Sequence, residues 1–125
     1  MTPLVCSHVR LCPSKQVSTI TERGFLAEQD ATIVTLQGAR RAAYGTQVEA
    51  SGGIMQETVR LTVEVNRPEL TRALRRSGFC WWVCEALLSD GSTLMVGDMQ
   101  FPASISFSGS DSQDSMTLTA IRPAN

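Results

Sequence analysis

The stretch IMQETVRLTVEV, residues 54–65, decides the fold because apolar and polar residues alternate along it. One face would carry Met55, Val59, Leu61, Val63 and Val65, and the other Gln56, Thr58, Arg60, Thr62 and Glu64. A period of two with many β-branched residues is typical of a strand that has one face in the core and one in solvent. Such strands occur mainly in antiparallel sheets. We therefore expect residues 54–65 to form a half-buried antiparallel strand.

The signals of one short helix follow this strand. Asn66 can cap the helix, Pro68 is tolerated in its first turn, and Glu69 stands at the capping-box position. An apolar stripe follows, made by Leu70, Ala73 and Leu74. Three arginines gather near the C-terminal end, where the helix dipole favours cations: Arg72, Arg75 and Arg76. Gly78 then provides a stop, so the sequence predicts a helix over residues 67–77.

Two further runs, FCWWVCEALL and STLMVGD, flank the turn Ser89-Asp90-Gly91-Ser92 and predict a β-hairpin. In a strand beginning at Phe79, Cys80 and Cys84 would share a face with Trp82 between them. Their Cα atoms would lie about 13 Å apart at ~3.3 Å per residue, which is beyond disulfide reach. We expect both thiols to be reduced and unbridged, with at least one of them buried.

The cysteine spacing does not fit a redox or zinc device. Redox pairs are C-x-x-C at a helix N-terminus, whereas this chain has C-x-x-x-C after a helix. The remaining candidate ligands, Cys6, His8 and Cys12, match no common zinc module. We therefore predict no metal site and no cofactor.

Other catalytic chemistry has little support in the sequence. His8 is the only histidine and has no identifiable partner for general-base work. The segment SFSGSDSQDS lacks the strained elbow of a hydrolase nucleophile, and Asp111 and Asp114 do not follow the spacing of a calcium loop. We interpret that segment as a solvated hairpin turn. No catalytic residue is predicted, and the chain is not expected to be an enzyme.

The rest of the chain completes a mainly β pattern. Short strands are expected in VCSHVRL (residues 5–11), ATIVTLQ (31–37), ASISFSG (103–109) and SMTLTAI (115–121). With 125 residues, the expectation is one domain, an antiparallel β-sandwich or barrel of about six or seven strands with one short helix. Residues 13–30 and 38–53 would be long loops. Long ordered loops are often functional, so Arg40, Arg41 and Tyr44 in the second are candidate interface residues.

Charge and hydropathy exclude some partners. The chain has 11 basic and 12 acidic residues, a formal net charge of -1, and Lys15 as its only lysine. This balance gives no electrostatic reason to expect nucleic acid or an anionic membrane. No apolar run approaches the roughly 20 residues that span a bilayer. We expect a protein made in the cytosol, where its cysteines stay reduced.

Residues 54–125 resemble small β-rich structural proteins from the tail and neck modules of tailed bacteriophages and prophages. The likeness lies in the order of VRLTVEVNRPEL, the helix TRALRRS, the hairpin CEALLSDGSTLMVGD and the last pair ASISFSGSDSQDSMTLTAI. The resemblance implies a non-enzymatic virion subunit of tail-tube, tail-completion, neck or baseplate-adaptor type. Such a subunit assembles in the host cytoplasm into a ring, through sheet edges and loops. Its partners would be copies of itself and neighbouring phage proteins.

A second class of function remains open at this point. The chain could be a small-ligand or metal-binding β-domain, with the strand of Trp81 and Trp82 lining a pocket. Its ligands would then come from Cys6, His8, Cys80 or Cys84. A metal assay on the purified protein separates the two hypotheses.

Overall fold

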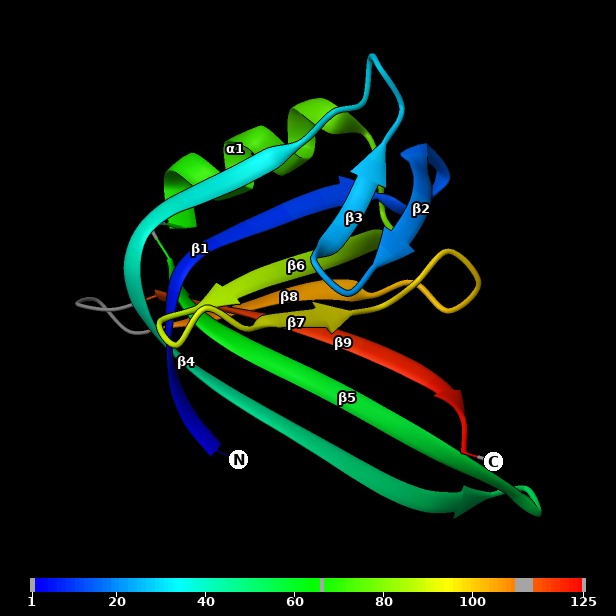
Figure 1. Cartoon of the computed structure of the whole chain (residues 1–125). Helices are drawn as coiled ribbons and strands as arrows, with labels where there is room; N and C mark the ends of the chain where they lie inside the picture. The colour runs from blue at the N-terminus through cyan, green and yellow to red at the C-terminus, as the bar shows by residue number, and fades with distance from the viewer. Residues whose placement is uncertain (1, 66, 110–113, 125) are drawn as a thin grey trace.

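A computed structural model describes residues 2–65, 67–109 and 114–124 of the chain (Figure 1). Its described part is mainly β, as expected, with nine strands in antiparallel sheets and one α-helix. The elements are β1 (Thr2–Pro13), η1 (Ser14–Gln16), β2 (Val17–Thr21), β3 (Gly24–Ala27), β4 (Val34–Ser51), β5 (Ile54–Val65), α1 (Arg67–Ser77), β6 (Trp82–Leu88), β7 (Thr93–Val96), β8 (Ser104–Gly109) and β9 (Asp114–Pro123). The strand count exceeds the expected six or seven.

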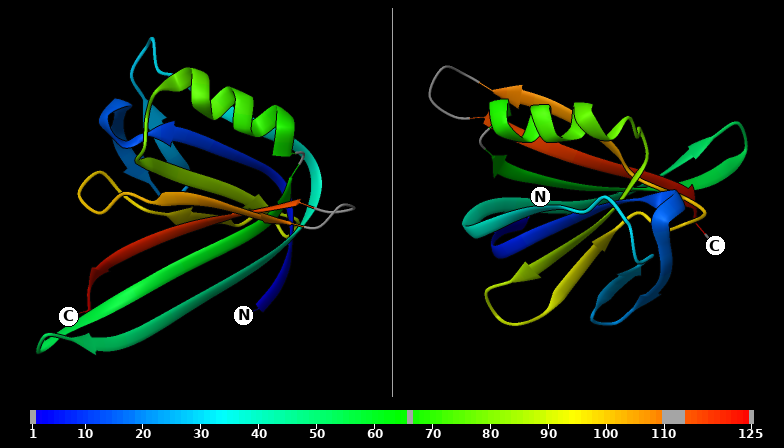
Figure 2. Two further views of the ribbon diagram at one scale, coloured as in Figure 1. Left: turned by 180° about the vertical axis from the view of Figure 1, so that it is seen from behind. Right: turned by 90° about the horizontal axis from the view of Figure 1, so that it is seen from above.

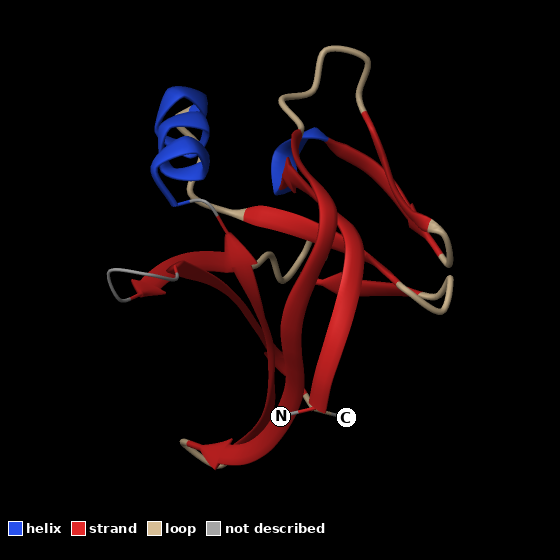
Figure 3. Ribbon diagram, turned by 90° about the vertical axis from the view of Figure 1, so that its left-hand side faces the viewer, coloured by secondary structure: helices blue, strands red, loops and turns tan. Residues whose placement is uncertain are grey.

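Seven strands form one strongly curved sheet in the order β7-β6-β1-β4-β5-β9-β8. Figure 3 shows its two halves facing each other in a sandwich-like arrangement. The sheet curls until Trp82, at the start of β6, exchanges two backbone hydrogen bonds with Ala103, of 2.9 and 2.7 Å. Gly97 lies beside this closure, where a Cβ atom would come within 2.7 Å of the Ala103 nitrogen. Its φ of +82° also favours glycine.

The main core lies between the two halves of the curved sheet. Its largest fully buried side chains include Leu61 and Val63 of β5, Met116 and Leu118 of β9, and Trp82 of β6. The ring of Phe79 packs edge-on against that of Trp82, with centroids 6.3 Å apart. The strand predicted for residues 54–65 is confirmed, and its alternation holds from Val59 to Val65, because Val59, Leu61, Val63 and Val65 are all buried. Nearer the turn it does not hold, because Met55 is exposed and Thr58 is buried.

The helix α1 has the predicted bounds and lies beside β1 and the first half of β4 (Figures 1 and 2). Leu70 is buried in the main core, and Leu74 packs against it, which confirms the predicted apolar stripe. Gly78 follows the helix with φ of +73°, the left-handed conformation of a helix stop. The capping role predicted for Asn66 lies outside the described residues.

The prediction of a loop at residues 38–53 is wrong, because residues up to Ser51 belong to β4. The alanines, glycines and glutamate of this segment have weak strand propensity, so no local pattern indicated a strand. Its backbone is instead held by pairing with β1 on one side and β5 on the other. Tertiary pairing of this kind overrides intrinsic propensity. Gly38, with φ of +96°, lies where the β1–β4 register shifts by one residue.

The prediction of a long loop at residues 13–30 is also wrong. It contains η1 and the β2–β3 hairpin, whose strands of five and four residues are too short for a clear alternation signal. This hairpin covers the outer face of the main sheet, where Phe25 and Val17 pack against Cys12 and Val83 in a second buried cluster.

The strand predicted from Phe79 begins three residues later, at Trp82. Cys80 and Trp81 precede it and are both exposed, so Cys80 does not share a strand face with Cys84. The rest of the predicted hairpin is confirmed, because β6 pairs with β7 across the turn at residues 89–92.

Candidate assembly surface

The β4–β5 hairpin extends well beyond the core. Its strands stay paired from Ala42↔Val63 to Ser51↔Ile54, and its tip projects at the lower right of Figure 1. Gly52 and Gly53 form the turn, with φ of +60° and +82°. Two consecutive positive φ values are what a tight two-residue hairpin turn needs, and glycine supplies them without steric cost. We call residues 46–57 the hairpin tip.

Large apolar side chains are exposed on this tip and next to it. The exposed fractions are 52% for Val48, 61% for Ile54, 47% for Met55 and 50% for Ile121 on the adjoining β9. Exposed apolar patches on soluble proteins usually mark interaction sites. The hairpin tip is therefore a candidate interaction surface.

The apolar residues occupy both faces of the tip. Paired residues on neighbouring strands share a face. Val48 and Met55 therefore continue the face that carries the buried Val59, whereas Ile54 lies on the opposite face together with Ile121. A partner would have to contact both faces of the tip to bury all four of these apolar side chains.

One side of the tip is braced by β9, and the other side is open. Arg122 of β9 donates from Nε to Oε1 of Glu57 at 2.9 Å, and the Ala124 amide donates to the carbonyl of Met55 at 2.9 Å. On the other side, β1 pairs with β4 only as far as Tyr44. Within the described residues no strand pairs with that edge of β4 from Gly45 to Ser51. Open edges of this kind accept another strand readily.

The candidate interface residues Arg40, Arg41 and Tyr44 do not form one surface. Arg40 is half-buried and donates from Nη1 to the Glu64 carbonyl at 3.0 Å and from Nη2 to the Gln37 carbonyl at 3.2 Å. Tyr44 packs against the main core. Arg41 is exposed and, by strand alternation, lies on the face opposite to the other two. The large exposed apolar residues of the hairpin, Val48, Ile54 and Met55, lie farther along, at the tip.

The structure places the four cysteine side chains in three different environments. Cys6 and Cys84 are buried in the main core, Cys12 in the second cluster, and Cys80 is exposed. All four are free thiols, as expected for Cys80 and Cys84. Burial raises the pKa of the Cys6, Cys12 and Cys84 thiols above the ordinary value, so these groups are neutral near pH 7. His8 is half-buried on β1.

Metal ligands do not come together in the described part of the chain. No group of three or more His, Cys, Asp or Glu side chains there could hold a metal ion. Asp111 and the side chain of Asp114 lie outside the described residues. Trp82 is enclosed in the core and Trp81 is exposed, so this pair does not line a common pocket.

A small cavity of about 210 Å³ lies where the sheet leaves the core and becomes the hairpin. Its lining includes Tyr44, Val59, Met95, Phe101 and Arg122. Asp98 also lines it, but its carboxylate already accepts hydrogen bonds from the amides of Gln100 and Phe101. These side chains provide a partly enclosed recess with a mixed polar and apolar lining.

The apolar residues of the tip were missed as functional residues, although the sequence carries a signal for them. A glycine pair flanked by strand-forming residues predicts a two-residue hairpin turn. Taking Gly52 and Gly53 as such a turn would have paired residues 46–51 with 54–59 and placed Val48, Ile54 and Met55 beyond the core.

Comparisons with known proteins found no matching family model, no matching curated protein and no matching solved structure. Among the described residues, no helix combines the length and apolar character needed to cross a membrane.

Proposed function

We propose that this chain is a non-enzymatic structural subunit that assembles with copies of itself into a ring. The observation that carries the proposal is the hairpin tip, which extends past the core and exposes Val48, Ile54 and Met55. A tip of this kind adds little to the fold, since its large apolar side chains are exposed rather than packed in the core. It has the properties of an arm that becomes buried on assembly.

The open edge of β4 supports the same function. Between Gly45 and Ser51, alternate residues of β4 direct their backbone amide and carbonyl groups away from β5, next to the exposed apolar side chains. Natural proteins usually protect such an edge with lysine, proline or a bulge. The segment from Gly45 to Ser51 contains neither lysine nor proline and has Glu49 as its one charged residue, which favours an edge that is used for pairing.

The setting that we propose is the virion of a tailed phage. This part rests on the resemblance of residues 54–125 to tail and neck proteins, which implies a tail-tube, tail-completion, neck or baseplate-adaptor subunit. The segments that carry the resemblance form β5, α1, the β6–β7 hairpin and the β8–β9 hairpin. The partners would be copies of the chain and neighbouring phage structural proteins, after assembly in the host cytoplasm.

The experiment measures the oligomeric state of the purified chain across a range of concentrations by sedimentation velocity, with electron microscopy of the largest species. Rings of a single size would support the proposal, and recovery of the chain from purified particles would support the phage setting. A chain that stays monomeric at every concentration and is absent from particles would overturn it. Stoichiometric zinc in the metal assay would favour the metal-binding alternative instead.

A further inference from the structure

The open edge of β4 presents hydrogen-bonding groups at alternate residues. The carbonyl of Met55 accepts the Ala124 amide on the β9 side, so the backbone of Met55 is directed away from β4. Met55 pairs with Ala50, and the backbone groups of Ala50 are therefore directed away from β5. Because this direction alternates along a strand, Thr46 and Val48 share it with Ala50. Within the described residues, no strand pairs with these three residues on that side.

The open edge also has a definite length. β1 covers this side of β4 as far as Tyr44, which pairs with Thr2. The turn of the hairpin begins at Gly52. The seven residues from Gly45 to Ser51 lie between these two limits. A partner strand on this edge would continue the sheet from the place where its pairing with β1 stops.

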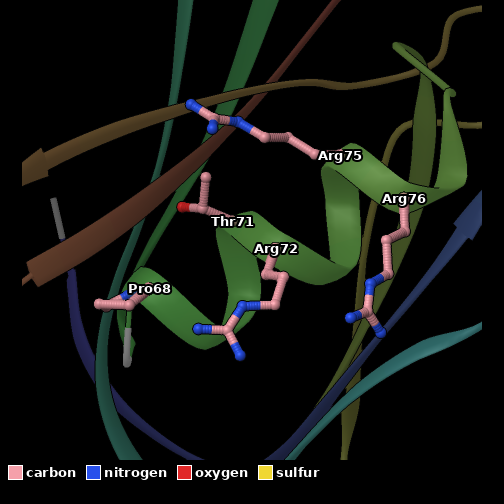
Figure 4. Close-up of a pocket in the computed structure, with 5 residues that line it drawn as sticks. All are labelled: Pro68, Thr71, Arg72, Arg75 and Arg76. Carbon is pink, nitrogen blue, oxygen red and sulfur yellow. The ribbon is translucent and has the colours of Figure 1, made fainter.

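The partner on this edge must be a strand rather than the helix of another copy. Figure 4 shows the outer surface of α1, from which the side chains of Arg72, Arg75 and Arg76 extend. A helix uses its backbone amide and carbonyl groups for its own hydrogen bonds. Its surface therefore offers side chains only, and the backbone groups of β4 would stay unpaired beneath it.

Among strands, the same segment of a second copy fits the edge best in length. The strands at the two edges of the main sheet are β7 and β8, with four and six residues. The start of β8 is also held by the hydrogen bonds between Ala103 and Trp82. Residues 45–51 of a second copy provide seven residues with the same alternation of outward groups.

Antiparallel pairing centred on Val48 uses the whole open edge of both copies. Gly45 of one copy then lies opposite Ser51 of the other, and Val48 lies opposite its own counterpart. Residues with outward backbone groups meet each other, since Thr46 lies opposite Ala50. Each such pair can exchange two backbone hydrogen bonds, as in any antiparallel ladder.

The neighbouring registers are less favourable. A shift of two residues is the smallest that keeps outward groups opposite each other. In one direction this shift places Glu49 opposite the Glu49 of the second copy, and like charges directly opposite each other destabilise a sheet. In the other direction it places Ser51 opposite Ala43, which already pairs with Pro3 of β1.

The side chains fit the register centred on Val48. Glu49 lies opposite Gln47 of the second copy, where the amide group can donate a hydrogen bond to the carboxylate. On the other face, the two Val48 side chains lie side by side, and each is 52% exposed in the single chain. Pairing would therefore bury part of the exposed apolar surface of both copies.

We propose that residues 45–51 of two copies pair as antiparallel strands about a two-fold axis at Val48, which joins their two sheets into one. This inference rests on the proposed function, because it requires that copies of the chain assemble with one another. A two-fold contact closes with two copies. The ring of the proposed function is then built from such pairs, joined through a second surface. Ile54 and Ile121 remain exposed on the face opposite to Val48 and are available to that surface.

The first test places charges at the proposed axis of the full-length chain. Val48→Lys and Val48→Glu each set two like charges opposite each other, so each variant alone should lose the paired species. An equimolar mixture should recover it as a one-to-one complex, because a lysine then faces a glutamate. Sedimentation velocity and native mass spectrometry measure the mass and composition of each species.

The matched controls place the same charges elsewhere on the tip. Ile54→Lys and Ile54→Glu change a residue that is also exposed but lies on β5, away from the axis. Each of these variants should still pair when it is alone. Circular dichroism and urea unfolding establish that every variant is folded before its mass is interpreted.

Disulfide trapping tests the register. All variants carry Cys80→Ser, which removes the exposed native thiol. Hydrogen-bonded antiparallel partners have Cα atoms about 5.5 Å apart, a distance that a disulfide spans. Val48→Cys should therefore form a covalent dimer when it is oxidised with copper phenanthroline. Glu49→Cys alone should not, whereas a mixture of Gln47→Cys and Glu49→Cys should, because these two positions lie opposite each other.

The outcomes separate this inference from the proposed function. If the unmodified chain forms rings and both charged variants at Val48 assemble equally well, or if Glu49→Cys cross-links alone as readily as Val48→Cys, the edge pairing is wrong and the assembly function stands. If the predicted cross-links form but the unmodified chain stops at dimers, the inference stands and the ring is overturned. If the unmodified chain stays monomeric at every concentration and no cysteine variant cross-links, both are overturned.

Discussion

The carboxylate of Glu85 on β6 lies 3.1 Å from the guanidinium of Arg10 on β1, on the face of the main sheet that the β2–β3 hairpin covers. Glu85 also accepts the backbone amide of Phe25 at 3.0 Å, and Arg10 lies 4.6 Å from the centre of the Phe25 ring. A Cβ atom on Gly24 would overlap the same carboxylate. This one ion pair therefore joins the hairpin to the sheet.

We expect Arg10→Leu to cost more stability than Glu85→Gln. The side chain of Glu85 is only 8% exposed, so losing Arg10 leaves a buried carboxylate without its counter-charge, at a cost of about 2–3 kcal/mol. The amide introduced by Glu85→Gln would keep an oxygen to accept the Phe25 amide, and this variant should cost about 1 kcal/mol. Urea unfolding followed by tryptophan fluorescence measures both.

The double variant with leucine at both positions provides the control. A coupled pair gives a double variant that is more stable than the sum of the two leucine substitutions predicts. Strictly additive losses would mean that the pair contributes nothing beyond its separate contacts with Phe25.

A second prediction concerns the register of β5. Leu61→Asp places a charge at a fully buried position and should cost about 4 kcal/mol or more, enough to unfold a marginal domain. Thr62→Asp lies on the other face, where it loses one hydrogen bond to Thr117 and should cost about 1 kcal/mol. Equal urea midpoints for the two variants would contradict the observed register.

The parts of the fold that the sequence predicts correctly are those with a strong local pattern of apolar residues. The alternation at residues 54–65 and the stripe of Leu70, Ala73 and Leu74 both recur at the period of one secondary structure, and both elements appear as expected. The weak segments depend on distant pairing. Residues 38–51 become a strand because β1 and β5 supply hydrogen bonds from both sides, which no local pattern encodes.

The candidate assembly surface, too, is only partly predictable from local sequence patterns. Residue type alone selects Arg40, Arg41 and Tyr44 from an expected loop, and strand alternation separates Arg41 from the other two. The hollow between α1 and the first half of β4 joins residues more than thirty positions apart, Leu36 and Leu70 among them, so only the tertiary structure reveals it. Residue types point to residues 38–53 as an assembly segment, but they do not show which of these residues face outward.

The thiols provide a third prediction. In the folded chain only Cys80 is exposed, so one thiol should react rapidly with a thiol-specific reagent near pH 8, and the other three should react only as the chain unfolds. Cys80→Ser should remove the rapid phase, with the slow phase unchanged. More than one rapid thiol in the unmodified chain would contradict the burial of Cys6, Cys12 and Cys84.

The same burial makes stability depend on alkaline pH. Burial raises the pKa of Cys84 above its ordinary value of 9.0, so the unfolded chain loses this proton at a lower pH than the folded chain does. The contribution is complete below about pH 9 and is lost as pH rises further. The urea midpoint should therefore be lower above pH 9 than below it. This difference should be smaller in Cys84→Ala, which lacks the titrating thiol.

The last prediction separates the hairpin tip from the fold. Val48 and Glu57 are cross-strand partners. Replacing residues 49–56 with Asn-Gly would connect them by a two-residue turn, for which Asn-Gly is well suited. The replacement removes Ile54, Met55 and Glu49 but keeps the Glu57–Arg122 ion pair and every buried residue of β4 and β5. We expect the free energy of unfolding of the monomer to change by less than about 1 kcal/mol, because exposed residues contribute little to stability. Assembly should be lost at every concentration at which the unmodified chain forms oligomers, as measured by sedimentation. A shortened chain that still assembles would remove the main argument for an assembly arm, and one that unfolds would assign the tip to the fold itself.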